Sequence, residues 1–77
     1  MAGELTKAVA DLQEDEAIKL VNSKLEGGTD PNEILVEARN GMETVGKRFG
    51  DGEYFLPELI FSAEIFKELT AILKPRM

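Results

Sequence analysis

Apolar side chains recur at spacings of three and four residues in four stretches of this chain, and glycine, proline and acidic residues separate those stretches. This period is typical of amphipathic helices, whereas a half-buried strand would alternate apolar and polar residues. The pattern predicts helices over about residues 3–12, 15–26, 31–49 and 57–73. Because the connections between them are short, we expect an all-α fold, an antiparallel four-helix bundle.

Specific residues mark the limits of the two middle helices. Asp15 is the predicted N-cap of the second helix. Gly27-Gly28 is predicted to end that helix, since glycine adopts the left-handed conformation of a helix C-terminus without a clash at Cβ. Asp30 is the predicted N-cap of the third helix, and Pro31 suits the first helical position, where an N–H group would have no partner.

The spacing of apolar residues also predicts the buried side of each helix. Three sets are expected to face the core: Ile18, Val21 and Leu25 in the second helix, with Ala17 and Leu20 at the edges; Leu35, Ala38, Met42, Val45 and Phe49 in the third; Leu59, Ala63, Phe66 and Leu73 in the last, with Ile65, Leu69 and Ile72 beside them in a wide stripe. Gly41 and Gly46 interrupt the third helix, each at a cost of about 1 kcal/mol relative to alanine. Either a neighbouring helix approaches closely at these glycines, or the helix lies against a bulky ligand or a second domain.

The junction between the third and fourth helices gathers the aromatic residues, which lie in it or just after it: Phe49, Tyr54, Phe55, Phe61 and Phe66. Leu56 has the predicted N-cap position before Pro57, where Ser, Thr, Asp or Asn would stabilise the helix by about 1 kcal/mol more. We therefore expect the Leu56 side chain to serve a contact. The apolar cluster either closes one end of the bundle or covers something flat and apolar.

The composition excludes several classes of function. A chain of 77 residues forms one small domain, and without Cys or His it lacks disulfides, thiolate metal ligands and imidazole groups. A net charge of −6 argues against a nucleic acid or an anionic membrane as a partner. No stretch reaches the roughly 20 apolar residues of a transmembrane helix, and we expect a cytoplasmic protein.

Neither acidic segment of the chain has the pattern of a chemical site. Glu14-Asp15-Glu16 has no apolar surroundings that would make it an acid–base pair, and it is typical of a helix start. Gly50-Asp51-Gly52 lacks the lysine and the preceding strand of a phosphate-binding loop, and the further oxygen ligands of a calcium loop. We therefore predict no catalytic residue and no metal ligand.

One joint motif resembles a known family. It consists of Gly41-Met42-x-x-Val45-Gly46-x-x-Phe49, then Gly52-Glu53-Tyr54-Phe55-Leu56-Pro57-Glu58-Leu59, then Ser62-Ala63 and Lys74-Pro75. These residues closely resemble the N-terminal helical cap domain of corrinoid (vitamin B12) proteins. That family includes the corrinoid subunits of methanol and methylamine methyltransferase systems and the cap of cobalamin-dependent methionine synthase. The resemblance covers nearly all of the chain.

The resemblance implies a domain plan and a binding site. Residues 1–74 would be the helical cobalamin cap domain, and residues 75–77 the start of a linker to a missing α/β cobalamin-binding domain. In the family the α/β domain holds the corrin and supplies a histidine to cobalt, while the cap covers the upper face, where the methyl group is carried. The cofactor-binding residues that the resemblance implies here are Phe49, Leu56 and Leu59.

The same resemblance implies a role and a set of partners. The chain would be a non-catalytic part of a corrinoid carrier that moves a methyl group between methyltransferases. Its partners would be the α/β domain and a substrate-specific methyltransferase, and this chain alone would bind cobalamin weakly or not at all. The alternative is a cofactor-free helical module for protein interaction or dimerisation. If the cluster normally faces a corrin and an α/β domain, it is exposed without them, and we expect the isolated chain to form a homodimer through it.

Overall fold

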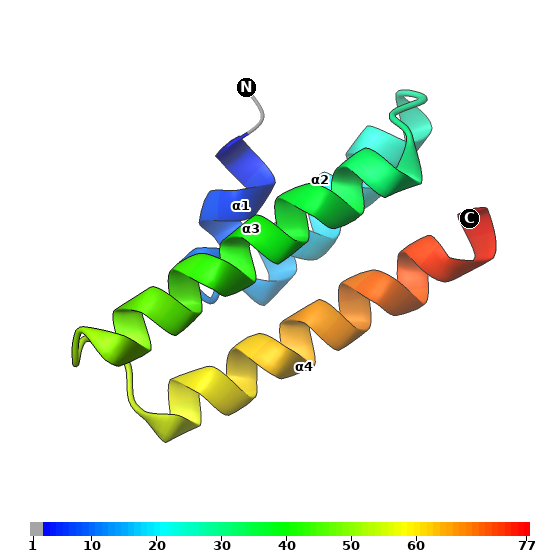
Figure 1. The fold of residues 1–77 in the computed structure, drawn as a ribbon. Coiled ribbons are helices and arrows are strands. Elements are labelled where there is room, and N and C mark those ends of the chain that lie inside the picture. Colours follow the sequence, from blue (N-terminus) through cyan, green and yellow to red (C-terminus); the bar gives the residue numbers. More distant parts are fainter. Residues whose placement is uncertain (1–2) are drawn as a thin grey trace.

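The computed structural model describes residues 3–77, and over that range the chain is all-α, as predicted (Figure 1). Its helices are α1 (Gly3–Ala10), α2 (Glu14–Glu26), α3 (Pro31–Gly50) and α4 (Leu56–Leu73), followed by a single 3₁₀ turn, η1 (Lys74–Arg76). The prediction of four helices joined by short connections is confirmed for these residues.

The two long helices, α3 and α4, form an antiparallel hairpin, and α1 and α2 pack against it (Figure 1). With a rise of about 1.5 Å per residue, α3 is roughly 30 Å long and α1 roughly 12 Å. The hairpin therefore forms the length of the bundle, and α1 covers only part of α3. The connection between α3 and α4 lies at one end of the molecule.

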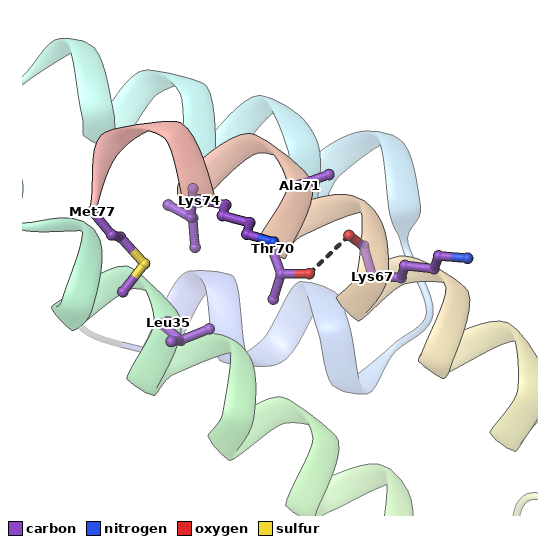
Figure 2. A pocket seen from close by; sticks show the side chains of 7 residues that line it. Leu35, Lys67, Thr70, Ala71, Lys74 and Met77 are labelled. Atoms are coloured by element: carbon purple, nitrogen blue, oxygen red, sulfur yellow. Dashed lines mark hydrogen bonds between the residues drawn. The ribbon is translucent and has the colours of Figure 1, made fainter.

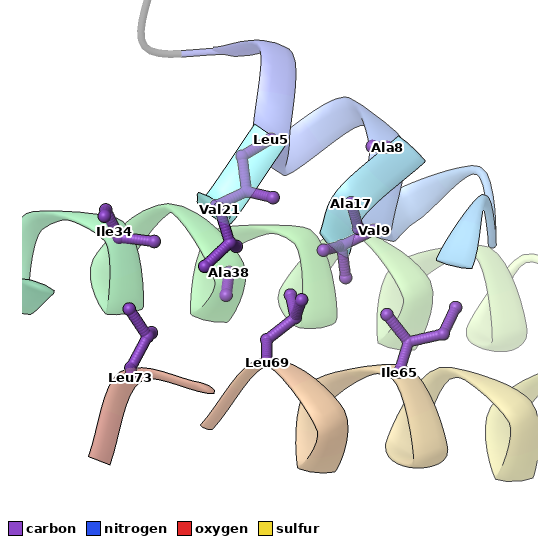
Figure 3. Close-up of a cluster of buried hydrophobic side chains, with 10 residues drawn as sticks. All are labelled: Leu5, Ala8, Val9, Ala17, Val21, Ile34, Ala38, Ile65, Leu69 and Leu73. Atoms are coloured by element: carbon purple, nitrogen blue, oxygen red, sulfur yellow. The ribbon is translucent and has the colours of Figure 1, made fainter. Parts of the chain in front are cut away.

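The core is a cluster of buried apolar side chains from all four helices (Figure 3). It consists of Leu5, Ala8 and Val9 from α1, Ala17 and Val21 from α2, Ile34 and Ala38 from α3, and Ile65, Leu69 and Leu73 from α4. The alanines among them are small, so the helices can pack closely at these positions. Most of this core lies away from the connection between α3 and α4.

The limits of α3 and the end of α2 follow the predicted signals. Asp30 Oδ1 accepts a hydrogen bond from the N–H of Asn32 at 2.9 Å, and Pro31 is the first residue of the helix. Gly28 has a φ of 88° and lies just beyond the end of α2. This left-handed conformation is the one for which the glycine was expected.

The connection between α1 and α2 differs from the prediction and comprises residues 11–13. Leu12 takes the left-handed conformation, with a φ of 61°, and the N–H of Gln13 donates to the carbonyl of Ala8 at 2.9 Å. As a result α1 ends two residues earlier than expected, at Ala10, and Gln13 is the N-cap of α2. The predicted N-cap, Asp15, lies instead in the first helical turn, where its charge suits the helix dipole.

The predicted buried sides of the helices are wrong in part. In α3 the buried residues are Ile34, Ala38, Gly41 and Val45, whereas Leu35 and Met42 are half-buried and Phe49 is exposed. In α4 they are Ser62, Ile65, Leu69 and Leu73, whereas Leu59 and Phe66 are half-buried and Ala63 is exposed. In α2 they are Ala17 and Val21, with Ile18 and Leu25 half-buried. Helix α3 packs on α1 and α4 at once, and this turns its buried side toward α1. In α4, apolar residues occupy so much of the circumference that their spacing does not determine which side is buried.

Candidate functional site

The residues expected to face a cofactor lie on either side of the connection between α3 and α4. Phe49 is in the last turn of α3, and Leu56 and Leu59 are in the first two turns of α4. The antiparallel hairpin brings these turns side by side (Figure 1). Phe49 is 43% exposed and Leu56 is 59% exposed, while Leu59 is half-buried. Burial along α4 begins only at Ser62, so the cluster does not close the end of the bundle as a plug.

Phe49 and Gly46 lie on the side of α3 that faces α4. Leu35 lines a groove together with residues of α4, so the Leu35 side chain marks the side of α3 that faces α4. Gly46 is about three turns beyond Leu35 and Phe49 about four turns beyond it, so both lie over the same side. Phe49 and Gly46 are exposed on this side of the helix.

The two glycines of α3 have different surroundings. A Cβ at Gly41 would lie 2.6 Å from Val9 Cβ, whereas a Cβ at Gly46 would have nothing within 4 Å. Close helix approach therefore explains Gly41. Gly46 leaves open space beside Phe49 that no described residue of this chain fills. The sequence singled out both glycines, but spacing alone could not separate their roles.

The start of α4 is built differently from the expectation. Phe55, and not Leu56, is the N-cap, and its N–H donates to Glu58 Oε1 at 2.9 Å. The Glu58 carboxylate, from the first turn of the helix, thus accepts from the backbone N–H of the N-cap residue, as in a capping box. Phe55 is 65% exposed, and Ile60 and Phe61 are exposed as well. The apolar surface around the connection is therefore larger than the three predicted residues.

A partly buried hydrogen-bonded cluster that the sequence analysis missed joins the α3–α4 connection to the end of α1. Arg48 Nη1 is 2.9 Å from the carbonyl of Ala10, 2.9 Å from Asp11 Oδ1 and 3.0 Å from the Tyr54 hydroxyl. The Tyr54 hydroxyl donates to the same Ala10 carbonyl at 2.7 Å. The bonds to Asp11 and Tyr54 raise the pKa of the Arg48 guanidinium. The only sequence signal was an arginine and a tyrosine flanking the loop.

The groove that Leu35 lines has a volume of about 350 Å³ and lies at the other end of the hairpin (Figure 2). Its lining is mainly apolar and comes from Leu35, Lys67, Thr70, Ala71, Leu73, Lys74 and Met77. Thr70 is roughly 21 Å from Leu56 along the axis of α4, at about 1.5 Å per residue. This groove is therefore separate from the surface around Phe49 and Leu56.

The described residues offer no site for a bound metal ion. Over residues 3–77, no three His, Cys, Asp or Glu side chains come together in a way that could hold one. The same part of the chain contains no helix with the length and apolar character needed to cross a membrane.

Comparison with known proteins gives a consistent group of relatives. The family model described as "B12 binding domain" matches residues 1–74. The trimethylamine corrinoid protein of Methanosarcina barkeri is 35% identical over 72 residues, which are 92% of this chain and 33% of that protein. Methionine synthase of Mycobacterium leprae is 46% identical over 46 residues, which are 60% of this chain and 4% of that protein.

These relatives are much longer than the chain, which spans about a third of the length of the corrinoid proteins it matches. No solved structure matches the chain. The family model covers nearly the whole sequence and includes the junction motif on which the resemblance rested. The chain therefore belongs to the B12 binding domain family, as its resemblance to the helical cap of corrinoid proteins predicted.

Proposed function

We propose that this chain is the cap module of a corrinoid protein that carries a methyl group on cobalt between methyltransferases, and that it covers the upper, methyl-bearing face of the corrin. The observation that carries the proposal is the exposure of Phe49 and Leu56 at the α3–α4 connection. Small proteins seldom leave large apolar side chains together in water unless a ligand or partner covers them. Membership of a B12-binding family suggests a corrinoid, whose flat ring offers a face that such side chains can cover.

The residues at the connection fit that ligand. Phe49, Leu56 and Leu59 present apolar groups, which suit contact with a ring face and a methyl group better than polar ones. The open space at Gly46 lies on the same side of α3 as Phe49, so a broad planar group can approach the helix backbone there. Thus both the chemistry and the available room at this end of the hairpin favour a corrinoid.

The chain's own contribution would be shielding. A bound corrinoid supplies the methyl-transfer chemistry through its cobalt. With no His or Cys in the sequence, the chain offers neither an imidazole nor a thiolate ligand to that metal. Apolar side chains over the reactive face would exclude water and oxidants. The α/β domain that follows such caps would hold the rest of the corrin, and a substrate-specific methyltransferase would be the reaction partner.

An exchange experiment tests the proposal. The chain would replace the matching segment of the M. barkeri trimethylamine corrinoid protein, and the hybrid would be loaded with cobalamin and reduced. We expect oxidation of the reduced cobalt to be several-fold slower than in the same hybrid carrying Phe49→Ala, Leu56→Ala and Leu59→Ala. The unexchanged relative controls for loading. Equal oxidation rates in the two hybrids would contradict the proposal.

The alternative is a cofactor-free module that associates through the same end. The exposure of Ile60 and Phe61, beyond the three residues expected over the corrin, favours a larger apolar partner. In that case the hybrid would oxidise at the rate of its alanine variant, while the chain would still bind a protein or a second copy of itself. The oxidation rate of the reduced cobalt is therefore the measurement that distinguishes the two functions.

A further inference from the structure

We propose that Arg48 and Tyr54 are positioning residues, which fasten the α3–α4 connection to the end of α1 and thereby hold Phe49 and Leu56 in place for their ligand. The inference rests on the proposed function for the identity of that ligand. Its structural part, the ordering of the connection, can be measured on the chain without any cofactor.

The first support is the convergence of bonds on one carbonyl. The last carbonyls of a helix have no partner within the helix. At the end of α1, the carbonyl of Ala10 accepts from Arg48 Nη1 at 2.9 Å and from the Tyr54 hydroxyl at 2.7 Å. Asp11 Oδ1 accepts from the same Arg48 nitrogen at 2.9 Å, so charge reinforces the contact. Residues far apart in the sequence thus fix α1 to the connection.

The second support is the order of the connection itself. The N–H groups of Glu53 and Tyr54 both donate to the carbonyl of Arg48, at 2.9 and 3.1 Å. The N–H of Phe55 donates to Glu58 Oε1 at 2.9 Å, which ties the connection to α4. The Arg48 guanidinium also lies 5.6 Å from the centre of the Tyr54 ring, within the range of a cation–π contact. The connection is therefore bonded to α1, α3 and α4.

The third support is the place of the two anchors in the sequence. Arg48 immediately precedes Phe49, and Tyr54 lies two residues before Leu56. Arg48 and Tyr54 thus position the stretches of backbone that carry the exposed side chains of Phe49 and Leu56. An ordered connection keeps those side chains from collapsing onto each other, and it lowers the conformational entropy lost when a ligand binds.

The test compares Tyr54→Phe with Thr6→Val. Tyr54→Phe removes one hydroxyl and keeps the ring. Thr6→Val is the matched control, because the Thr6 hydroxyl also joins α1 to α3, donating to the carbonyl of Glu37 at 2.8 Å, but far from the connection. We expect amide exchange at Glu53 and at position 54 to become about tenfold faster in Tyr54→Phe only. NMR order parameters of the Leu56 methyl groups should fall in that variant and stay unchanged in the control.

A second readout places both substitutions in the hybrid corrinoid protein. We expect Tyr54→Phe to speed cobalt oxidation and Thr6→Val to leave it unchanged. Equal effects of the two variants, or unchanged amide exchange in Tyr54→Phe, would overturn the proposal. So would an unchanged oxidation rate in Tyr54→Phe when the triple alanine hybrid does oxidise faster. If the triple alanine hybrid oxidises at the wild-type rate, the proposed function fails, and amide exchange alone decides whether these anchors order the connection.

Discussion

Gly41 of α3 lies directly against Val9 of α1: a Cβ at Gly41 would be 2.6 Å from Val9 Cβ and 2.8 Å from the carbonyl oxygen of Thr6. Such distances are shorter than van der Waals contact, so α1 would have to move away if Gly41 carried a side chain. The close approach also brings α1 to the position from which its C-terminal carbonyl meets Arg48 and Tyr54. The packing of one glycine is thus linked to the anchoring of the α3–α4 connection.

Gly41→Ala is therefore expected to destabilise the chain. Overpacking a close contact typically costs about 1–3 kcal/mol, which outweighs the gain in helix propensity. Thermal unfolding followed by circular dichroism should show a midpoint lower by about 4–8 °C for each kcal/mol lost. A variant as stable as the wild type would mean that α1 does not pack against α3 at this glycine.

Gly46→Ala is expected to act in the opposite direction. Nothing lies within 4 Å of a Cβ at Gly46, and the residue is in a helix interior, so alanine should stabilise the isolated chain. The expected gain in the free energy of unfolding is about 0.5–1 kcal/mol, measured by urea titration. In the hybrid corrinoid protein the alanine side chain should speed cobalt oxidation, because it would occupy the space that we propose the corrin ring fills. A stabilised variant with unchanged oxidation would show that Gly46 does not face the cofactor.

Local sequence signals predicted where the helices lie. They did not predict which side chains are buried or which residues bond across helices, because contacts between helices determine both. The N-cap and the first position of α3 depend on Asp30 and Pro31 alone, and both predictions are confirmed. Phe49 was assigned to the buried side of α3 by its spacing, but it is exposed, because its burial depends on where α1 ends and α4 begins. The contacts of Arg48 and Tyr54 with α1 join residues about forty positions apart, and no local pattern encodes them.

Leu56→Ala should affect the cofactor much more than the fold. Because Leu56 is 59% exposed and is not the N-cap, its truncation should change the free energy of unfolding by less than about 0.5 kcal/mol. Leu69→Ala is the matched comparison, since this leucine is fully buried and its loss should cost about 2–5 kcal/mol. Urea unfolding gives both values. A loss of several kcal/mol in Leu56→Ala would identify Leu56 as a core residue.

Cobalamin binding by the isolated chain should be weak. The chain offers apolar contacts to one face of the ring, and it has no His or Cys to bind cobalt. Contacts of this kind must offset the translational and rotational freedom lost on association, which costs at least about 4 kcal/mol. We therefore expect little or no heat in a calorimetric titration with methylcobalamin. Micromolar or tighter binding would show that the cap carries much of the affinity by itself.

Homodimerisation is the expected behaviour of the isolated chain at high concentration. Phe49, Phe55 and Leu56 are exposed at one end of the hairpin, and a second copy can cover them. A closed two-fold contact is the commonest geometry for such self-association. The net charge of −6 opposes it, so added salt should tighten the dimer by screening the repulsion. Sedimentation equilibrium at low and high salt measures both effects.

Two charge substitutions locate the dimer interface. Leu56→Glu should abolish association, because it places a carboxylate within the apolar surface at the connection. Val36→Glu is the matched control: Val36 is 51% exposed, close to the 59% of Leu56, but it lies in the first half of α3, away from the connection. We expect this control to dimerise nearly as well as the wild type, with a small loss from its added charge. A wild-type chain that stays monomeric at high micromolar concentration would contradict the prediction, as would equal dimerisation by the Leu56→Glu variant.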